Sequence, residues 1–525
     1  MLFINHKWLA YGGVIASIVI LVLLMRITPT GMVPNEDTGT FFVIVDMPPA
    51  TSLENTKVAL SKVDSLLAAN SAIKSRTEIA GYSFIAGQGS SYGTFICKLK
   101  NWDERGKGQD VNSVIGSIYM QAKTLIKDAR VLAFAPPMIP GYSITNGFEF
   151  NVQDKTGGDL NEFFNITQNF LNKLQERPEI ATAQTSFNPN FPQYMVDIDV
   201  AKCKKAGISP ATLLATLQGY YGGIYASNFN RFGKLYRVMI QADANFRANP
   251  ETLNNVMVRN GNEMAPITQF ITLRKIYGPD NIKRFNMFTA ISVNGAPADG
   301  YSSGEAIQAI QEVASETLPT GYGYEFSGMT REEQSSGSGT TAMIFALCLI
   351  FVYLLLSAQY ESYILPLGVI LSVPAGLMGS FIFAQFMGVE NNIYMQIALI
   401  MLIGLLAKNA ILITEFALDR RKTGMSVADA AISGAVSRLR PILMTSLAMV
   451  IGLLPLMFAH GVGANGNSTL GTGAIGGMLI GMICQIFIVP ALFVLCQNVQ
   501  EKIKPIQWHD TDNTDIEAEI EQYTK

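Results

Sequence analysis

Long apolar runs separated by polar segments are the main pattern of this chain, and they predict six membrane-spanning helices. The first run, Trp8–Met25, carries no charge and is long enough to cross a hydrocarbon core of about 30 Å. A cleaved signal peptide is the alternative. However, no small-residue cleavage motif follows and Arg26 stands where one would be, so we favour an uncleaved anchor. The five further runs are Thr341–Leu356, Ile364–Met387, Ile393–Phe416, Pro441–Ala459 and Thr472–Cys496.

The segment between the first two runs has the pattern of a large water-soluble insertion, with strands and helices in alternation. Its first part predicts the order β-α-β-β-α-β, the split βαβ arrangement, and ends at a proline-rich boundary. A second unit is predicted in two parts, with a smaller subdomain inserted between them. The chain therefore divides into a first helix (1–28), a first subdomain (29–135), a second subdomain in two parts (142–190 and 282–338), an inserted subdomain (191–281), a five-helix bundle (339–500) and an acidic tail (501–525).

Basic residues near the ends of the runs predict the orientation in the membrane, because cytoplasmic loops are rich in Lys and Arg. With six spans, both termini and the predicted loops 357–363 and 417–440 share one side. That side holds Lys7, Arg420, Arg421, Lys422, Arg438, Arg440, Lys502 and Lys504. The short opposite loops, 388–392 and 460–471, contain neither Lys nor Arg. We therefore expect both termini in the cytoplasm and the insertion outside, which in a bacterium with two membranes is the periplasm.

The composition agrees with a membrane protein that has a substantial soluble part. Hydrophobic residues make up 49% of the 525 residues and charged residues only 15%, against about 25% charged residues in soluble domains. The formal net charge of −3 offers no basic surface for DNA or RNA, so no nucleic-acid partner is expected. The five cysteines and three histidines are scattered, so neither a metal site nor a cofactor is predicted.

Lys408 is the most informative residue of the predicted bundle. It lies about 12 Å of helix from the nearer end of its run at Phe416, which exceeds the reach of a lysine side chain. An ammonium at that depth costs at least about 2.5–3.5 kcal/mol, so we expect it to face the bundle interior and to meet a carboxylate. No Asp or Glu lies in the middle of any run of this chain. The partner carboxylate is therefore missing from the sequence.

Other candidate residues also have ordinary structural interpretations. Arg438 and Thr445 project from one helix face, but a basic residue belongs at a cytoplasmic boundary and a threonine can bond its own helix. Residues 81–93 mix glycines with aromatic side chains, which suits a gate beside a pocket for apolar ligands or a plain hairpin loop. Phe148 and Phe150 alternate on a predicted strand and fit the core as well as a cleft.

These residues stand within a series of motifs that resembles the carboxyl-terminal half of the AcrB-type resistance-nodulation-division (RND) efflux pumps, the hydrophobe/amphiphile branch. The resemblance runs over about residues 8–500. Its motifs are Val33–Gly39, Leu318–Gly321, Phe326–Met329, Tyr360–Ser362, Gly404–Ile413, Leu439–Leu447 and Gly471–Gly473. The resemblance implies an α+β membrane protein in which ferredoxin-like split βαβ porter subdomains and an inserted docking subdomain form a periplasmic insertion between six transmembrane helices.

The resemblance also implies roles for particular residues and partners. The residues are Lys408, Arg438 and Thr445 for a proton relay, Tyr82, Phe84, Phe95, Phe148 and Phe150 for substrate binding, and Gly81, Gly87, Gly89 and Gly93 for a switch loop between two drug pockets. The implied protein is no enzyme but a trimeric, proton-driven antiporter of the inner membrane. It exports small hydrophobic and amphiphilic compounds (drugs, detergents, bile-salt-like molecules) through a periplasmic adaptor protein and an outer-membrane channel.

The chain departs from the family in length. A complete pump has a second bundle of spans that carries the two relay aspartates, so the resemblance places the counter-charge of Lys408 on a missing amino-terminal half. The chain is then one subunit of a split pump or a fragment. The alternatives are a Sec-associated export subunit, a metal-efflux RND pump, and a non-transporting fragment or scaffold half.

Overall fold

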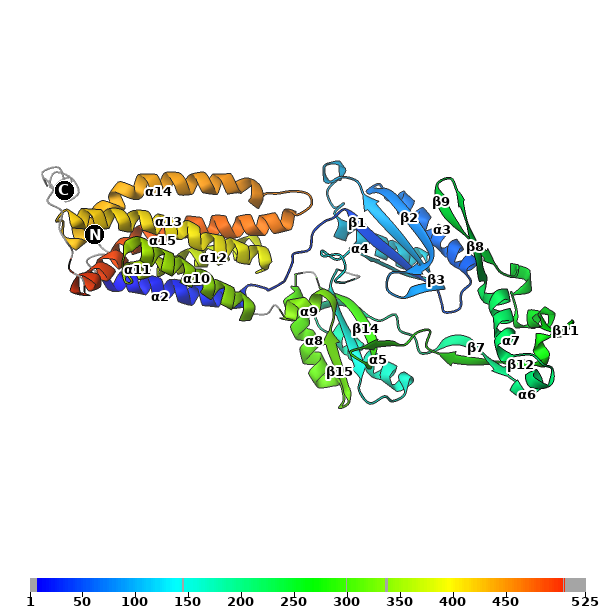
Figure 1. Cartoon of the computed structure of the whole chain (residues 1–525). Coiled ribbons are helices and arrows are strands. Elements are labelled where there is room, and N and C mark those ends of the chain that lie inside the picture. Colours follow the sequence, from blue (N-terminus) through cyan, green and yellow to red (C-terminus); the bar gives the residue numbers. More distant parts are fainter. Residues whose placement is uncertain (1–6, 144–145, 299, 336–338, 504, 506–525) are drawn as a thin grey trace. The chain divides into compact units, whose positions relative to one another are not determined.

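The computed structural model describes residues 7–143, 146–298, 300–335, 339–503 and 505. It contains two compact units, one formed by Met1–Phe187 with Ile282–Lys525 and one formed by Asn188–Asn281. The first unit holds the apolar helices and two β-sheets, and the second is a smaller unit of helices and short strands (Figure 1). Most of the predicted acidic tail, residues 506–525, lies outside the described residues.

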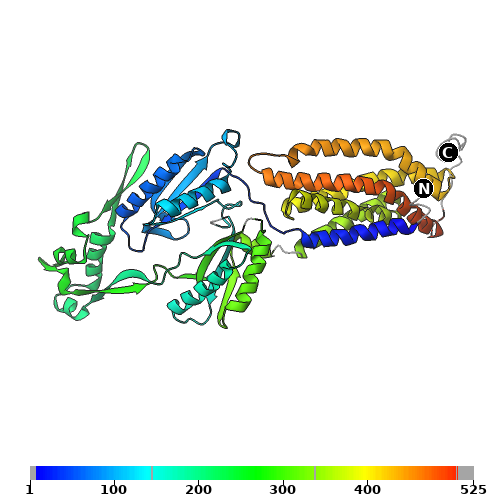
Figure 2. The same cartoon turned by 180° about the vertical axis from the view of Figure 1, so that it is seen from behind.

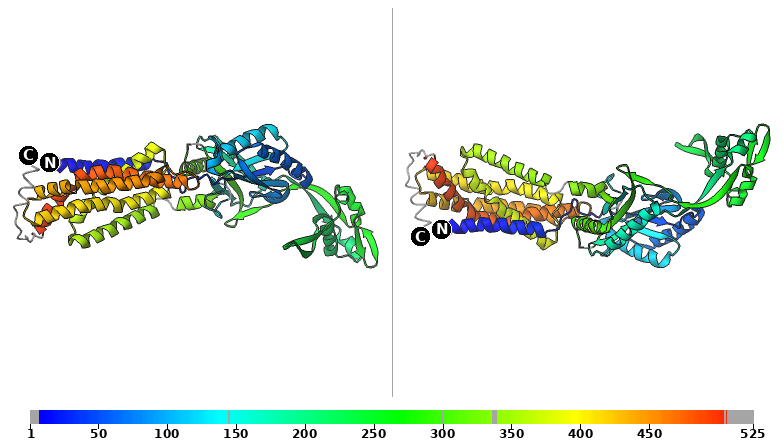
Figure 3. Two further views of the ribbon diagram at one scale, coloured as in Figure 1. Left: turned by 90° about the horizontal axis from the view of Figure 1, so that it is seen from above. Right: turned by 90° about the horizontal axis from the view of Figure 1, so that it is seen from below.

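Among the described residues, six apolar segments of the first unit are helical and long enough to cross a membrane, as the sequence predicts. They are α2 (Lys7–Ile27), α10 (Gly339–Tyr360), the pair α11 (Leu365–Ile370) and α12 (Val373–Met387), α13 (Ile393–Lys422), α14 (Val427–Met457) and α15 (Ala464–Ile503). The helices lie side by side, and α15 is central because it packs against α2, α11, α12, α13 and α14 (Figures 1 and 2). Both views of Figure 3 show α2 running along this bundle.

Helix boundaries differ from the apolar runs in several places; α15, for example, begins at Ala464 within the predicted loop 460–471 and ends at Ile503. The run Ile364–Met387 forms two helices, because the chain turns before Val373 and Pro374 occupies the first turn of α12, where its missing N–H is not needed. The segment 417–440 is mostly helical instead of a loop. Hydropathy marks only the part of a helix that suits hydrocarbon, whereas α14 begins where Ser426 caps it by accepting the N–H of Asp429 at 3.2 Å.

The first sheet lies in the segment after α2 and has the strand order β2-β3-β1-β4 with antiparallel neighbours. Its elements follow one another as β1 (Thr40–Asp46), α3 (Leu53–Ala69), β2 (Ile73–Ser83), β3 (Gly87–Leu99), α4 (Val111–Leu125) and β4 (Arg130–Phe134). The helices α3 and α4 pack on one face of the sheet around a core that includes Phe41, Leu60 and Phe95. The other face is not covered by these two helices.

The second sheet combines strands from both sides of the smaller unit in the sequence. Its order is β13-β14-β5-β15, and β6 also pairs with β14. The elements are β5 (Phe148–Asp154), α5 (Leu160–Gln175), β6 (Ile180–Gln184), β13 (Lys283–Phe285), β14 (Phe288–Pro297), α8 (Ser303–Thr317), β15 (Tyr322–Phe326) and α9 (Gly328–Ser335). The antiparallel pairing of β5 with β14 joins the two parts of this subdomain.

The smaller unit has its own core, which includes Cys203, Leu213 and Ile267. Its elements are β7 (Phe191–Ile198), α6 (Val200–Lys205), α7 (Pro210–Leu217), β8 (Ile224–Arg231), β9 (Lys234–Ile240), β10 (Met257–Asn260), β11 (Glu263–Pro266) and β12 (Ile271–Gly278). The strands β7 and β12, at the two ends of the unit, pair with each other over their whole length. This pairing brings the two connections to the first unit together.

Candidate functional site

Lys408 lies in the middle of α13, and its side chain is exposed on the surface of the bundle, although Ala407 and Asn409 beside it are buried. Within the described residues no ion pair of Lys408 is formed. The expectation that this ammonium faces the interior is therefore wrong for these six helices. The interior of the bundle is filled by apolar and small side chains and offers no carboxylate to it.

Thr445 lies level with Lys408 on the neighbouring helix α14. Asn409 donates its Nδ2–H to Ser446 Oγ at 3.1 Å, and this buried bond fixes the two helices at that level. Thr445 itself is exposed and donates its hydroxyl to the carbonyl of Ile442 at 3.2 Å. The structure thus brings the predicted lysine and threonine to one height on the α13–α14 surface.

Arg438 lies about two helical turns farther along α14, towards its start. Its guanidinium carbon is 4.6 Å from the centre of the Phe416 ring, a cation–π contact between α14 and α13. No hydrogen bond joins Arg438 to Lys408 or Thr445 in the described part of the chain. The three predicted relay residues therefore follow one seam between two helices and are not in mutual contact.

Small residues surround the lysine on this surface. Gly404, one turn before Lys408, and Gly452, two turns after Thr445, are exposed, and a Cβ added to either would meet nothing within 4 Å. Small residues at such positions let a second helix approach closely in a membrane. We call the surface formed by Gly404, Lys408, Thr445 and Gly452 the Lys408 face.

An aromatic cluster lies on the face of the first sheet that α3 and α4 leave uncovered. The ring of Phe42 is 4.8 Å from that of Phe84 and 5.9 Å from that of Phe134, and Tyr82 is 5.5 Å from Phe84. All four side chains are half-buried. Sequence reasoning selected Tyr82 and Phe84 but missed Phe42 and Phe134, although the alternation along β1 distinguishes Phe42 from the core residue Phe41.

The other three predicted ligand residues are core residues in this structure. Phe95 is fully buried against the helices, whereas the next residue, Ile96, is paired with Phe42 and shares the aromatic face. Phe148 and Phe150 are at most 2% exposed and belong to the core of the second subdomain, so neither lines a cleft here. Because side chains alternate across a strand, an error of one residue moves the prediction to the wrong face.

The predicted switch loop is the end of a β-hairpin. Strands β2 and β3 are paired up to Ser83 and Gly87, which leaves only a short turn between them. Gly81 and Gly87 have φ angles of 82° and 93°, a region that favours glycine. A Cβ on Gly93 would clash with the side chain of Leu60, so glycine is needed there for the packing of α3. Backbone and packing thus account for these three glycines.

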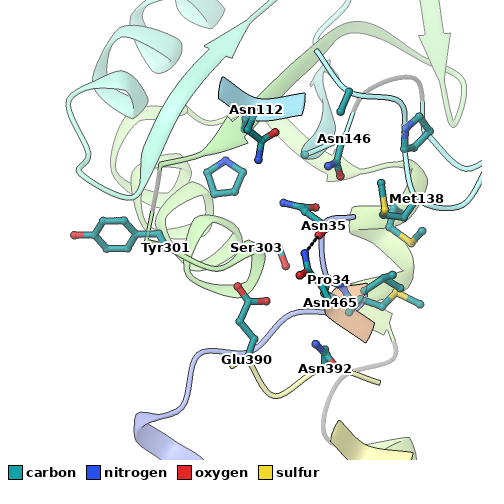
Figure 4. Close-up of a pocket in the computed structure, with 18 of the residues that line it drawn as sticks. Pro34, Asn35, Asn112, Met138, Asn146, Tyr301, Ser303, Glu390, Asn392 and Asn465 are labelled. Carbon is teal, nitrogen blue, oxygen red and sulfur yellow. Dashed lines mark hydrogen bonds between the residues drawn. The ribbon is translucent and has the colours of Figure 1, made fainter. Parts of the chain in front are cut away.

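A cavity of about 630 Å³ lies where α13 and α15 begin and α12 ends. Its polar lining includes Asn35, Ser303, Glu333, Glu390 and Asn392, and Figure 4 shows Glu390 pointing towards Ser303. Burial raises the pKa of Glu333 and of Glu390, and the negative charge of Glu390 raises that of Glu333 further. Ser303 donates to Glu333 at 2.5 Å, which partly opposes this increase.

Comparison with known proteins places this arrangement in a family. The family model described as the AcrB/AcrD/AcrF family matches residues 1–497. The chain belongs to the AcrB/AcrD/AcrF family. It is 36% identical to the multidrug/solvent efflux pump membrane transporter MepB of Pseudomonas putida, over 97% of this chain and 48% of that protein. It is 34% identical to the multidrug export protein AcrF of Escherichia coli, over 93% of this chain and 47% of that protein.

A third relative has a similar identity to this chain and a similar coverage. The multidrug resistance protein MdtF of E. coli O6:H1 is 32% identical over 92% of this chain and 47% of its own length. The chain therefore spans about half the length of the curated relatives it matches.

Proposed function

We propose that this chain acts as the carboxyl-terminal half of a proton-driven efflux pump for hydrophobic and amphiphilic compounds. The observation that carries the proposal is Lys408, which lies in mid-helix on an exposed face and has no carboxylate partner among the described residues. An ammonium at that depth needs a negative partner from protein, because lipid cannot solvate it. The relatives named for multidrug or solvent efflux are about twice as long and have room for a second bundle that supplies it.

The proposed mechanism uses the Lys408 face as the contact with that second bundle. While the partner carboxylates are charged, they hold Lys408, and protonation removes the attraction, so the two bundles shift relative to each other. Thr445 and Arg438 would extend the relay along the α13–α14 seam. A proton moving inwards would thereby drive the soluble subdomains, with residues 29–135, 142–190 and 282–338 as the porter and 191–281 as the docking subdomain.

The proposed substrates bind through the aromatic cluster of the first sheet. Half-buried rings on an open sheet face suit apolar ligands, since they add contact area without an ordered polar pattern. The aromatic cluster favours such ligands over metal ions, and membership in the AcrB/AcrD/AcrF family disfavours a Sec-associated export subunit. We further propose an inner-membrane location with cytoplasmic termini, a trimer of complete pumps, and export through an adaptor protein and an outer-membrane channel.

The test is Lys408→Ala in the complete pump that contains this chain. We expect efflux of a lipophilic fluorescent dye to fall at least tenfold, with unchanged accumulation of the protein and unchanged dye binding, because the charge pair that senses the proton is lost. Lys502→Ala is the matched control, since Lys502 is an exposed lysine at the end of α15. Normal efflux by the Lys408→Ala variant would refute the proposal.

A further inference from the structure

The segment Pro29–Asp37, which connects α2 to β1, is hydrogen-bonded at or just before the starts of several helices. Near its start, the carbonyl of Pro29 accepts the N–H of Asn391 at 2.9 Å, and the carbonyl of Met32 accepts the N–H of Ile393, the first residue of α13, at 3.2 Å. The carbonyl of Thr30 accepts the N–H of Gly304 in the first turn of α8 at 3.1 Å. We call Pro29–Asp37 the connecting strap.

Glu36 of the strap binds the beginning of α15. Its carboxylate accepts the N–H of Asn465 at 3.1 Å and that of Gly466 at 2.7 Å. These are N–H groups that a helix leaves unpaired at its first turn, where a negative charge is also stabilised by the helix dipole. Asn465 returns a bond by donating its side-chain N–H to the carbonyl of Asn35, and this bond is drawn in Figure 4. The strap and the central helix of the bundle are thus joined at three points.

Asp37, the next residue, binds the first soluble subdomain instead. Its carboxylate accepts from Arg105 at 2.8 Å and from the N–H of Val111, the first residue of α4, at 3.1 Å. The Arg105 side chain is only 5% exposed, so water competes little for this pair. Trp102 adds a bond from its ring N–H to the Asp37 carbonyl at 3.2 Å.

Two adjacent residues, Glu36 and Asp37, therefore bind two different parts of the fold, the membrane helices and the first soluble subdomain. Consecutive Cα atoms are about 3.8 Å apart, so a strap with Glu36 and Asp37 both bound has almost no slack between the start of α15 and the start of α4. The helix α15 packs against α13, which carries Lys408, and the strap also binds the first residue of α13 directly. A displacement of either helix along its axis must pull on the strap.

We propose that Glu36 and Asp37 are positioning residues that transmit movement of the membrane helices to the first soluble subdomain. The inference rests on the proposed function as a proton-driven pump, and it assigns the transmission step to a defined pair of carboxylates. In this arrangement α2 and β1 are joined by a rigid connection and not by a flexible linker. In this role neither carboxylate takes part in proton transfer or in substrate binding.

The test combines hydrogen–deuterium exchange on the purified chain with efflux by the complete pump. Glu36→Gln places an amide N–H against the N–H groups of α15. We expect faster exchange at 465–466, which is the direct effect of the substitution. We also expect a severalfold faster exchange at the start of α4. Efflux should fall about tenfold, with dye binding unchanged. Glu36→Asp keeps the negative charge and should recover at least half of the efflux. Glu104→Gln, an exposed glutamate near Trp102, is the control.

Two results would overturn the inference. One is faster exchange confined to 465–466 while the start of α4 stays as in the wild type, because the carboxylate would then only cap α15. The other is normal efflux by Glu36→Gln beside an active wild type. If the wild-type pump itself exports nothing, the proposed function fails, and the exchange measurement still decides whether the strap connects the two bodies.

Discussion

Single carboxylates of this chain have their ionisation set by what surrounds them. Asp46, at the end of β1, is half-buried on the same strand as Phe42, and this burial raises its pKa to about 6 although the nearby Arg130 partly opposes the increase. Its Oδ1 has no hydrogen-bond partner among the described residues. The folded state therefore binds a proton at Asp46 more tightly than the unfolded chain does.

This difference predicts a pH-dependent stability. Because the folded pKa lies above the unfolded value of 3.8, stability is highest below pH 4 with respect to this group and falls as the pH rises through about 6, by on the order of 3 kcal/mol in total. Asp46→Asn should abolish this loss, so the variant should be more stable than the wild type at pH 7.5 and equal to it near pH 4. Thermal melts at both pH values test this, with the exposed Asp103→Asn as control.

The site residues show what a single sequence can and cannot give at this scale. Alternation on β1 separates Phe41 from Phe42, but which of them faces the helices depends on the side that α3 and α4 cover. The cross-strand partners of Phe42, namely Ile96 and Phe134, depend on register, which is fixed by pairings far apart in sequence. Lys408 was found because a charge in an apolar run is rare, whereas its exposure depends on how six helices pack.

At the scale of helices and strands, the order of the elements follows from the sequence, whereas helix ends and single glycines are explained by caps and packing contacts. The predicted order of strands and helices in the first subdomain follows from local periodicity, which needs no tertiary information. The end of α13 and the start of α14 lie outside the apolar runs, since they depend on caps and charged turns instead of hydropathy. Gly93 belongs to the predicted switch loop, and the structure adds a packing reason for it, since the side chain of Leu60 fills the place of its Cβ.

A matched pair of glycine substitutions tests this packing. Gly93→Ala should destabilise the first subdomain by about 1–3 kcal/mol, because the added methyl group forces α3 away from the sheet. Gly116→Ala should instead stabilise α4 by about 0.5–1 kcal/mol, since its Cβ meets nothing within 4 Å and alanine favours the helix. Chemical denaturation of both variants checks the prediction, and equal effects of the two changes would show that backbone flexibility and not Leu60 decides.

At the scale of the whole molecule, the family is confirmed and the described residues contain six apolar helices long enough to cross a membrane, while the assembly stays a prediction. In sequence, the smaller unit is inserted into the second subdomain, but the two do not share a sheet. Among the described residues, β5, β6, β14 and β15 pair within their own sheet and with no strand of Asn188–Asn281. The sequence analysis places the inserted subdomain at 191–281, and the structure gives Asn188–Asn281. The pairing of β7 with β12 at the two ends of the unit joins residues far apart in sequence, so local patterns do not predict it.

Excising the smaller unit tests this independence. Replacing Asn188–Asn281 by a short glycine-rich linker should leave the second sheet folded, because the core around Phe150 and Ile310 includes no residue of the unit. Hydrogen exchange of β5 and β14 should then stay within twofold of the wild type. Loss of protection in both strands would show that the unit is required for the fold of its host.

The exposed position of Lys408 has a consequence for the life of the protein before assembly. A newly inserted copy that has met no partner presents an ammonium to acyl chains, which draws water and headgroups into the bilayer and marks the copy as incomplete. If a second bundle supplies the counter-charge, as proposed, these helices are less stable in the bilayer alone than in contact with that bundle.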